Sequence, residues 1–438
     1  MQPTGNLVAD TICRTAEIGL TITGAADAGN ITIIDATPVV VTGLCPDCGH
    51  AGKLRDHILR RLVDLPVVGG FPTRLHVRVP RFLCTAISCP RKIFQATLSC
   101  ADDGAKLTHR VTRWILQRLA IDRMSVSATA KALGVGWALV NQVALDACRD
   151  LVYGDPHHLD GVRSLGVDEH RWKHTRKPGQ PSNLVTILVD LTLLVDGCGP
   201  ARLLDLRPGR SAEVLRTWLQ ERDPGFREQV QVVTMDGFTG YASAVDQVLP
   251  DATKVMDPFH VVHLAADKLT GCRQRLQRET TGRRGRKDDP LYKYRRTLLT
   301  RTNYLTQRQK QRLDMLWATD DDYVALEVTW LFYQDMIAAY GHPQKSEGKK
   351  LMLRVINSLR KGLPAGLEEL AQLGRTLWRR REDVLAYFDI GASNGPVEAI
   401  NGRLEHLRGI ALGFRNLNHY ILRCLIHSGQ LQGKINAL

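Results

Sequence analysis

The order of strand-like and helix-like segments after residue 160 constrains the fold more than any other feature of this chain. Apolar or β-branched runs typical of strands lie at 163–167, 183–192, 201–206, 230–235 and 252–256. The first three follow one another, a helical segment precedes each of the last two, and a long helix follows the fifth. This βββαβαβα order is that of the ribonuclease H fold, in which the first strand lies beside the fourth.

Two acidic residues follow the strands that this fold makes neighbours. Asp168 comes directly after the first strand and Asp236 directly after the fourth. The carboxyl edge of an open sheet is where such folds place ligands. Close carboxylates repel one another unless divalent cations lie between them, and oxygen ligands suit Mg²⁺ or Mn²⁺. We therefore predict a site in which two such ions act on a phosphodiester bond.

A third carboxylate has to come from a later helix. Residues 394–403 have the pattern of a helix start, with Pro396 suited to the first turn and Glu398 within that turn. Asn401 lies three residues on and shares its face. Glu398 is therefore a candidate ligand, and a surface glutamate that complements the helix dipole is the alternative.

Other polar residues near these acids have supporting roles or none. His260 follows the fifth strand, where it either contacts a phosphate or is a structural histidine. With Asn401, it is a candidate for the layer of residues behind the metal ligands. Glu169 alternates to the strand face opposite Asp168, so we expect it to point away from the metal site.

Two close cysteine pairs predict a zinc site nearer the amino terminus. Cys45 and Cys48 form a C-x2-C pair, and Cys84 and Cys89 form a C-x4-C pair. Each pair can form one knuckle, and four thiolates bind Zn²⁺ tetrahedrally. A strand-like stretch at 75–82 lies between them, as in a zinc ribbon. We find no signal peptide, which favours metal ligands over disulfides. Four unrelated buried cysteines are the alternative.

Residues 125–143 have the spacing of a helix-turn-helix. Ser125 or Ser127 can cap a first helix, and Gly134 can make the turn. The second helix would offer three side chains to a DNA major groove, namely Trp137, Asn141 and Gln142. An ordinary helical hairpin with a glycine turn is the alternative.

The charge of the chain predicts a polyanionic partner. It has 59 Lys+Arg against 45 Asp+Glu, a net charge of +14. Residues 268–312 hold 15 of the basic residues and three acidic ones. We expect this part of a helical insertion to contact DNA phosphates, with a solvated helix surface as the alternative. The strongest candidates are Arg283, Arg284, Arg286 and Lys287. The sequence contains no run of about 18 apolar residues, so we predict no membrane span.

These motifs together resemble the DDE transposases of bacterial insertion sequences, specifically the ISL3 family, over nearly the whole chain. The four cysteines resemble that family's zinc-binding domain, and 125–143 resembles its helix-turn-helix. The segments that match its catalytic core are Val167–Glu169, Met235–Asp236 with Tyr241, Asp257–His260, and Asn394, Glu398 and Asn401 through Gly413–Asn416. The resemblance implies a catalytic triad of Asp168, Asp236 and Glu398. Glu405 departs from the pattern, because lysine is more often expected near there.

The expected architecture is a multidomain α+β and α/β chain. It has an N-terminal zinc ribbon, a helix-turn-helix and a ribonuclease H-like catalytic core with a helical insertion. The expected domains are an N-terminal β segment at 1–44, the zinc ribbon at 45–100, the helix-turn-helix at 101–155, the first part of the core at 160–265, the basic insertion at 266–390, and the C-terminal core helices at 391–438.

The resemblance implies a DNA transposase that binds terminal inverted repeats, cleaves phosphodiester bonds and joins the freed 3′-hydroxyl to target DNA. Its cofactors would be two Mg²⁺ or Mn²⁺ ions per active site and a structural Zn²⁺. We expect at least a dimer on DNA, in the bacterial cytoplasm at the nucleoid. Two alternatives remain: a structure-selective nuclease or resolvase with the same fold, and a non-enzymatic repressor with an inactive core.

Overall fold

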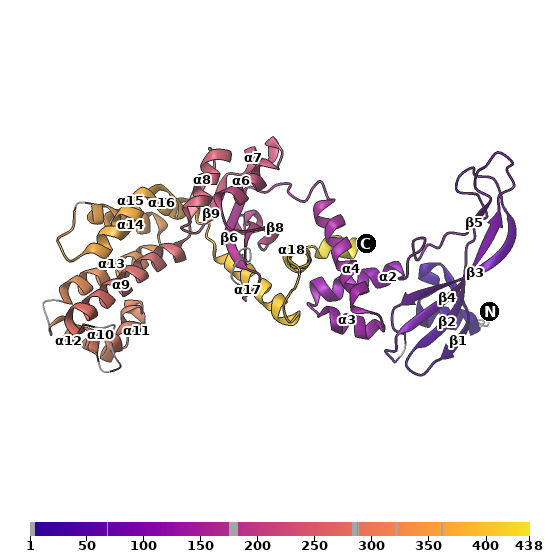
Figure 1. Ribbon diagram of the computed structural model, residues 1–438, viewed down its shortest axis with the longest axis horizontal. Helices are drawn as coiled ribbons and strands as arrows, with labels where there is room; N and C mark the ends of the chain where they lie inside the picture. Colours follow the sequence, from indigo (N-terminus) through magenta and orange to yellow (C-terminus); the bar gives the residue numbers. More distant parts are fainter. Residues whose placement is uncertain are drawn as a thin grey trace. The chain divides into compact units, whose positions relative to one another are not determined.

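The computed structural model describes residues 5–67, 69–174, 183–282, 287, 289–319, 323–360 and 362–438. It divides into two compact units, which we call the first unit (Met1–His158 with Leu404–Leu438) and the second unit (Leu159–Arg403). Figure 1 shows the course of the chain through both. Among the described residues, no helix combines the length and apolar character needed to span a membrane.

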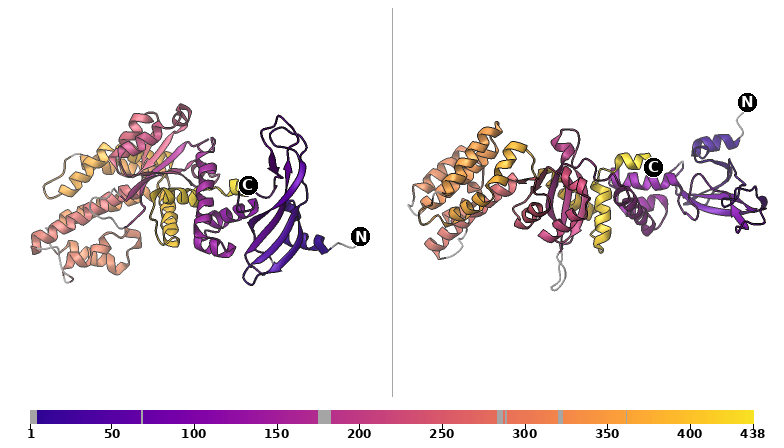
Figure 2. Two further views of the ribbon diagram at one scale, coloured as in Figure 1. Left: turned by 45° about the vertical axis from the view of Figure 1, so that its right-hand side comes forward. Right: turned by 90° about the horizontal axis from the view of Figure 1, so that it is seen from above.

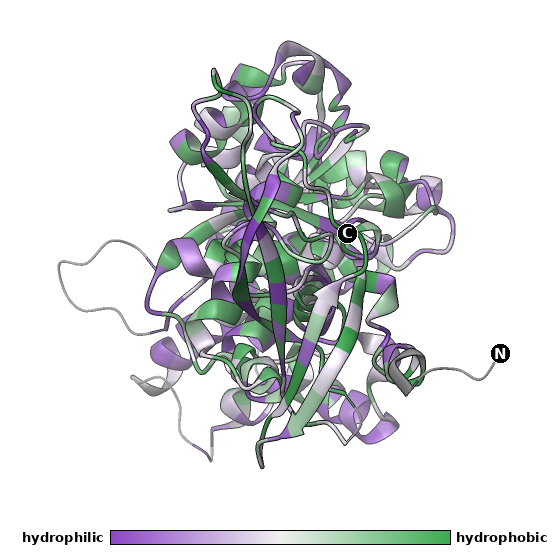
Figure 3. Ribbon diagram, turned by 90° about the vertical axis from the view of Figure 1, so that its right-hand side faces the viewer, coloured by the Kyte–Doolittle hydropathy of each residue, from purple (hydrophilic) through white to green (hydrophobic). Residues whose placement is uncertain are grey.

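A twisted sheet forms the amino-terminal part of the first unit. Its strands are β1 (Leu20–Asp27), β2 (Thr32–Pro38), β3 (Lys53–Asp64), β4 (Thr73–Leu83) and β5 (Ile93–Gln95). The order is β1-β2-β4-β3, with β5 paired to β4. Apolar and polar residues alternate along β4, so that Leu75, Val77 and Val79 are buried. The same alternation of green and purple runs along the strands in Figure 3.

Helix α1 (Gly5–Cys13) is a difference from the expected β segment at 1–44. Ala9 and Cys13, four residues apart, pack against the core of the sheet. Between them, the buried carboxylate of Asp10 accepts hydrogen bonds from Thr15, Thr21 and the Ile22 amide. A helical rather than alternating spacing of the contacting residues explains the difference.

Helices form the rest of the first unit. They include α2 (His109–Leu116), α3 (Val126–Leu133), α4 (Trp137–Cys148), α18 (Leu417–Ser428) and α19 (Gln432–Ala437). The Ser125 hydroxyl caps α3 by accepting from the Ala128 amide, and Gly134 turns the chain into α4 with a φ of 59°. Helix α18 packs against α4, which joins residues 404–438 to this unit.

The second unit is built on a five-stranded mixed sheet. Its strands are β6 (Ser164–Arg171), β7 (Leu184–Asp190), β8 (Arg202–Pro208), β9 (Val232–Met235) and β10 (Thr253–Met256). The order is β10-β9-β6-β7-β8, with β6 parallel to β9 and antiparallel to β7. The five strands lie where the sequence predicts them, and the predicted adjacency of first and fourth strands is confirmed.

Helices follow the strands of this sheet at the predicted places in the chain, with two short additions. The predicted helices are α6 (Ala212–Gln220), α8 (Thr239–Val248) and α9 (Pro258–Thr281); the additions are α5 (Thr192–Val195) and α7 (Pro224–Gln229). Trp218 of α6 and Tyr241 of α8 are 1% and 0% exposed in the core against the strands. A capping aspartate, Asp223, accepts from the Phe226 amide at the start of α7.

A helical subdomain follows β10 within the second unit. Its long helices are α9, α12 (Gln307–Trp317), α13 (Val324–Tyr340), α14 (Lys345–Arg360), α15 (Glu368–Arg379) and α16 (Arg381–Ile390). Several of them run side by side in Figures 1 and 2, and α16 packs against β10. Trp317, Trp330 and Trp378 pack against the apolar core of this subdomain.

Candidate functional site

Three carboxylates meet where β6 and β9 stop pairing. The last pair is Val167 with Met235, so Asp168 and Asp236 are the next residues of two parallel neighbours. One carboxylate oxygen from each of Asp168, Glu169 and Asp236 lies within 4.8 Å of the others. Asp168 and Asp236 are 6% and 4% exposed. The structure therefore brings together the two aspartates that strand order predicts to be close.

Arg210 links two of these acids. Its Nη1 lies 2.9 Å from Glu169 Oε1, and its Nη2 lies 3.0 Å from Asp236 Oδ2. The residue follows β8 after Gly209, which turns the chain with a φ of 93°. The guanidinium carbon lies 4.6 Å from the centre of the Phe238 ring. One positively charged guanidinium does not neutralise three carboxylates, so the cluster still attracts cations.

Glu169 belongs to this cluster, so the prediction that it points away from Asp168 is wrong. Alternation fixes the directions of the two Cβ atoms. However, the two methylene groups of glutamate let its carboxylate reach Arg210 at the strand edge. Asp168 folds back toward the same edge, because its Oδ1 accepts a hydrogen bond of 2.8 Å from the Glu169 amide.

Asn394 attaches the start of α17 (Gly395–Ile410) to the strands that carry the acids. Its Nδ2 donates to the carbonyl of Val167 at 3.0 Å, and its Oδ1 accepts from the Thr234 hydroxyl at 2.6 Å. The backbone N–H of Asn394 donates to Asp257 Oδ1 at 2.7 Å. The side chain is fully buried. These bonds fix the helix next to Asp168 and near Asp236.

The first turns of α17 lie directly against β6. A Cβ on Gly166 would come within 2.6 Å of Val397 Cγ2, so only glycine permits this approach. One turn later, Asn401 Nδ2 donates to Asp168 Oδ2 at 3.2 Å. Glu398 is exposed on the turn before Asn401, and its carboxylate is not among the three that cluster.

The environment shifts the pKa of several groups at this site. Burial and the charge of Asp236 raise the pKa of Glu169. Burial, together with the charges of Glu169 and Asp236, raises the pKa of Asp168 to about 7. The hydrogen bond from the Glu169 backbone amide lowers this pKa but does not outweigh the other effects. His260 Nδ1 lies 3.3 Å from Asp257 Oδ2, and that bond raises the pKa of His260 despite partial burial. The site therefore holds more negative charge than its surroundings neutralise.

The donor atoms fit a hard divalent cation. Among the described residues, the buried atoms Glu169 Oε2 and Asn401 Oδ1 have no hydrogen-bond partner. They add two oxygen donors to the carboxylates of Asp168 and Asp236. Oxygen-only sets of this kind are typical of Mg²⁺ and Mn²⁺ sites. Charge, burial and donor type agree, so this cluster is a candidate metal centre.

The four predicted cysteines form a second candidate metal centre. Strands β3 and β4 make a long hairpin, with Lys53 paired to Leu83, which returns Cys84 and Cys89 to the side of Cys45 and Cys48. The four Sγ atoms lie within 4.8 Å of one another, with Cys45–Cys89 at 3.9 Å and Cys48–Cys84 at 3.5 Å. Tetrahedral zinc with bonds of about 2.3 Å sets sulfur atoms about 3.8 Å apart.

The chemistry of these thiols also suits zinc. Burial raises the pKa of Cys45, but hydrogen bonds from the Cys48 and Asp47 amides outweigh it and bring the pKa to about 7. Burial raises the pKa of Cys89 to about 12. Only a cation in their midst allows all four sulfurs to be thiolates at neutral pH. The cluster therefore fits a structural Zn²⁺.

The predicted DNA contacts are distributed unevenly. Trp137 is 51% exposed, and the exposed Gln142 donates to Asp146. Asn141 is only 5% exposed and lines a pocket beside α18 instead of sharing a free surface with Gln142. In the predicted basic segment, Lys287 is exposed. The other three predicted contacts, Arg283, Arg284 and Arg286, lie outside the described residues.

Comparison with known proteins places the chain in a family. The chain belongs to the ISL3 family of DDE transposases, whose model, described as a transposase, matches residues 165–424. A second model, described as the zinc-finger of transposase IS204/IS1001/IS1096/IS1165, matches residues 42–89. The protein is thus a DNA transposase with an N-terminal zinc-binding domain, as the sequence motifs indicate.

Individual relatives agree with this assignment. The transposase for insertion sequence element IS1001 of Bordetella parapertussis is 24% identical over 408 residues, which is 91% of each chain. The transposase for IS1557 of Mycobacterium tuberculosis is 24% identical over 337 residues, 71% of each chain. Among solved structures, the Drosophila P element transposase strand transfer complex matches with a TM-score of 0.36 and 11% identity, over 72% of this chain and 90% of that one.

Sequence reasoning missed two arginines. Arg210 follows a strand in an Arg-Pro-Gly-Arg turn, and nothing in that turn reveals that its partners are Glu169 and Asp236. Arg423 lies in an apolar helix and is 4% exposed. An arginine at a core position of such a helix is the one signal that marks it for attention.

Proposed function

We propose that this transposase binds the terminal inverted repeats of its insertion sequence and catalyses metal-dependent cleavage and strand transfer. The proposed catalytic carboxylates are Asp168, Asp236 and Glu398. The observation that carries the proposal is the meeting of Asp168 and Asp236 at adjacent strand ends, in a buried cluster with more acids than bases. Such a cluster is costly to the fold unless cations bind it.

We also propose that the second unit contains a ribonuclease H-like core. Supporting this are the order β10-β9-β6-β7-β8, with the first strand at the centre, and the antiparallel β6–β7–β8 meander. The helical subdomain would then be an insertion between the fifth strand and α17. On this proposal the core within the second unit comprises residues 160–265 and 391–403, interrupted by 266–390, whereas residues 404–438, which the sequence led us to expect in the core, belong to the first unit.

Glu398 is proposed as the third carboxylate because α17 is fixed so closely to β6. Asn401, one turn further along the same helix, already touches Asp168. Residues three apart on a helix are neighbours, so Glu398 projects from the same side. Glu169 is the competing candidate, since its carboxylate lies within the cluster. We favour Glu398 because the contacts of Asn394 and Val397 hold the start of its helix against β6.

The proposed roles of the residues follow from their contacts. When bound, Mg²⁺ or Mn²⁺ would activate the attacking water or 3′-hydroxyl and stabilise the leaving oxygen. Asp168 and Asp236 would hold the ions, and Asn401 would orient the Asp168 carboxylate. Arg210 would neutralise part of the acidic charge and steady Asp236. His260, charged over a wider pH range because of Asp257, would face the phosphate.

The first unit would recognise DNA in the proposed scheme. Its α3 and α4 would act as a helix-turn-helix, with Trp137 and Gln142 at the exposed face of α4. The basic stretch at 268–312 would contact phosphates, which position DNA without reading its sequence. Both element ends must be held together for transposition, so we propose at least a dimer on DNA.

A joining assay tests the proposal. Purified protein is incubated with a labelled element end, target DNA and Mg²⁺, and cleaved and joined products are resolved on a gel. Wild type should yield both, and Asp236→Asn should yield neither while binding the end as wild type does. Cleavage without joining would instead indicate a nuclease or resolvase. Binding without cleavage by wild type would indicate a repressor.

A further inference from the structure

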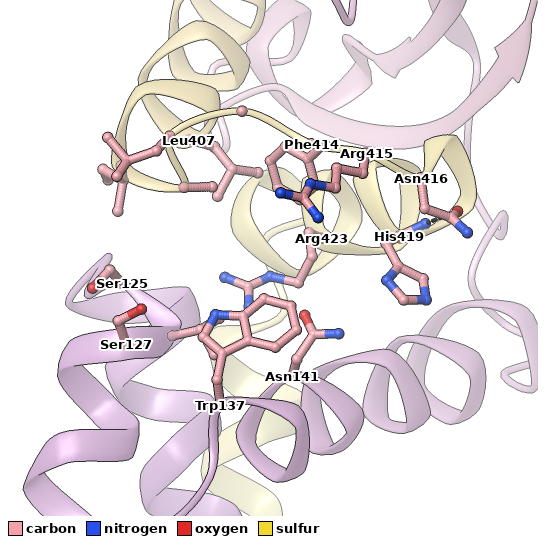
Figure 4. A pocket seen from close by; sticks show the side chains of 15 residues that line it. Ser125, Ser127, Trp137, Asn141, Leu407, Phe414, Arg415, Asn416, His419 and Arg423 are labelled. Atoms are coloured by element: carbon pink, nitrogen blue, oxygen red, sulfur yellow. Dashed lines mark hydrogen bonds between the residues drawn. The ribbon is translucent and has the colours of Figure 1, made fainter.

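A pocket in the first unit contains a buried arginine that has no counterion among the residues that the structure describes. The pocket encloses about 400 Å³ between α4, the segment 411–416 and α18. Figure 4 shows Arg423 extending from α18 into it, with Trp137 and Asn141 of α4 nearby. Every residue that lines it belongs to the first unit.

Arg423 is the unusual feature of this pocket. Its side chain is 4% exposed, and its Nε and Nη1 have no hydrogen-bond partner among the described residues. No aspartate or glutamate lines the pocket. Burial lowers the pKa of Arg423 to about 10, which leaves it charged at neutral pH. An unpaired buried charge destabilises a protein, so its retention points to a ligand.

The other lining groups define the chemistry of that ligand. Arg415 adds a second, exposed positive charge, and the buried Asn141 contributes an amide. Trp137 and Phe414 provide aromatic surfaces. The guanidinium fork of Arg423, with two free donors, matches the oxygens of a phosphate. The combination of cations, an amide and aromatic rings suits a phosphate joined to a flat, polar base.

We propose that this pocket binds one unstacked nucleotide of DNA, with its phosphate on Arg423 and its base against Trp137. The choice of DNA as the source rests on the transposase function. A fully paired duplex keeps its bases stacked and cannot offer a base face to Trp137, so the pocket selects DNA with an unpaired nucleotide. Base–aromatic stacking adds affinity with little sequence preference.

Binding by the full-length protein tests the proposal. Fluorescence anisotropy compares a labelled duplex with a single unpaired nucleotide and the same duplex fully paired. Wild type should bind the duplex with the unpaired nucleotide more tightly than the fully paired duplex. Arg423→Met should reduce affinity for the duplex with the unpaired nucleotide by about 10–100-fold, and affinity for the fully paired duplex by less than about threefold. Trp137→Ala should reduce affinity for the unpaired nucleotide by about 5–100-fold. Equal affinity of wild type for both DNAs overturns the proposal.

Thermal unfolding distinguishes a binding arginine from a structural one. Removing an unpaired buried charge in Arg423→Met should leave the melting temperature unchanged or raise it by about 2–4 °C. The matched control is Arg110→Met, which deprives the buried Asp64 of its arginine partner and should lower the melting temperature. A fall for Arg423→Met as large as that of the control shows a structural role and overturns the proposal.

Small ligands in solution distinguish a site for phosphate alone from a site for a whole nucleotide. Thymidine monophosphate should raise the melting temperature of wild type more than inorganic phosphate at equal concentration, and neither should affect Arg423→Met. Equal effects of both ligands would mean an anion site without a base, which contradicts the proposal. Asp236→Asn should bind the unpaired nucleotide like wild type, so failure of the catalytic proposal is recognised separately.

Discussion

At the scale of single residues, Arg210 shows how a side chain outside the acids organises them. It draws Glu169 toward Asp236 and thereby creates a three-acid cluster from residues that alternation would separate. Two glutamates, Glu169 inside the cluster and Glu398 on an exposed turn of α17, therefore compete for the role of third carboxylate. One is held within the sheet by Arg210, and the other comes from α17.

The first prediction separates these glutamates. Glu398→Gln should lower the rate of element-end cleavage by more than about 100-fold, because it removes a metal ligand without changing shape. Glu169→Gln should lower it much less, since the amide keeps one oxygen donor at the cluster and the change mainly weakens the pairing with Arg210. Cleavage rates with saturating Mn²⁺ provide the measurement. The reverse ranking would transfer the third catalytic role to Glu169.

The second prediction concerns pH and the metal-free protein. The pKa of Asp168 rises from its ordinary 3.8 to about 7 on folding. The contribution of protonated Asp168 to the free energy of unfolding is therefore fully present below pH 3.8, and it is lost as the pH rises through 7. The free energy of unfolding should therefore fall between about pH 4 and pH 7, by at most about 4 kcal/mol. Urea titrations measure it.

Asp168→Asn is the control for this pH dependence. Asparagine does not titrate, so the variant should show a flatter profile over the same pH range. Saturating Mn²⁺ should also oppose the loss in wild type, because the ion binds the ionised carboxylate. An identical pH profile in wild type and variant would contradict the assignment.

At the scale of elements, the approach of α17 to β6 decides the geometry of the acidic site. Gly166→Val should destabilise the protein by about 1–3 kcal/mol and reduce cleavage, because its side chain meets Val397. The control, Gly402→Ala on the same helix, meets no atom within 4 Å and should stabilise by about 1 kcal/mol. Urea unfolding and the cleavage assay test both variants. Equal behaviour of the two would argue against a tight contact.

The elements were predictable where local pattern alone determines them. Apolar runs bounded by glycine and acidic residues located all five strands, and the order of elements gave the adjacency of Asp168 and Asp236. The extension of β6 to Arg171 was not predicted, because polar residues at a strand end read as a turn. The role of Arg210 escaped prediction because its partners, Glu169 and Asp236, are distant in sequence and pair with it by side chain.

At the scale of the whole molecule, the zinc cluster closes the long β3–β4 hairpin at the end where its strands meet the rest of the chain. Cys84→Ser should lower the zinc content to below one ion per chain. It should also destabilise the amino-terminal sheet, because the metal supplies folding energy to such knuckles. Zinc is measured by atomic absorption and folding by limited proteolysis. Full zinc content in the variant would refute the four-cysteine site.

The charge of the molecule leads to a prediction about DNA binding. Affinity for element ends should fall steeply with salt, with a log–log slope of about −0.9 per phosphate neutralised. Replacing Lys287 by Gln should reduce the slope by about one, whereas Asp236→Asn should leave it unchanged. A flat salt dependence would contradict a role for the basic insertion in phosphate contact.

The first unit is assembled from segments separated by the whole of the second. Helix α4, which ends at Cys148, packs on α18, which begins at Leu417, so the ribosome adds 268 residues between the two helices. The nascent helices α3 and α4 therefore remain with one apolar side uncovered until translation has passed the proposed catalytic carboxylates. A chain that stops early lacks the partner for α4, so only a chain that also carries the acids completes the fold of its proposed DNA-reading helices.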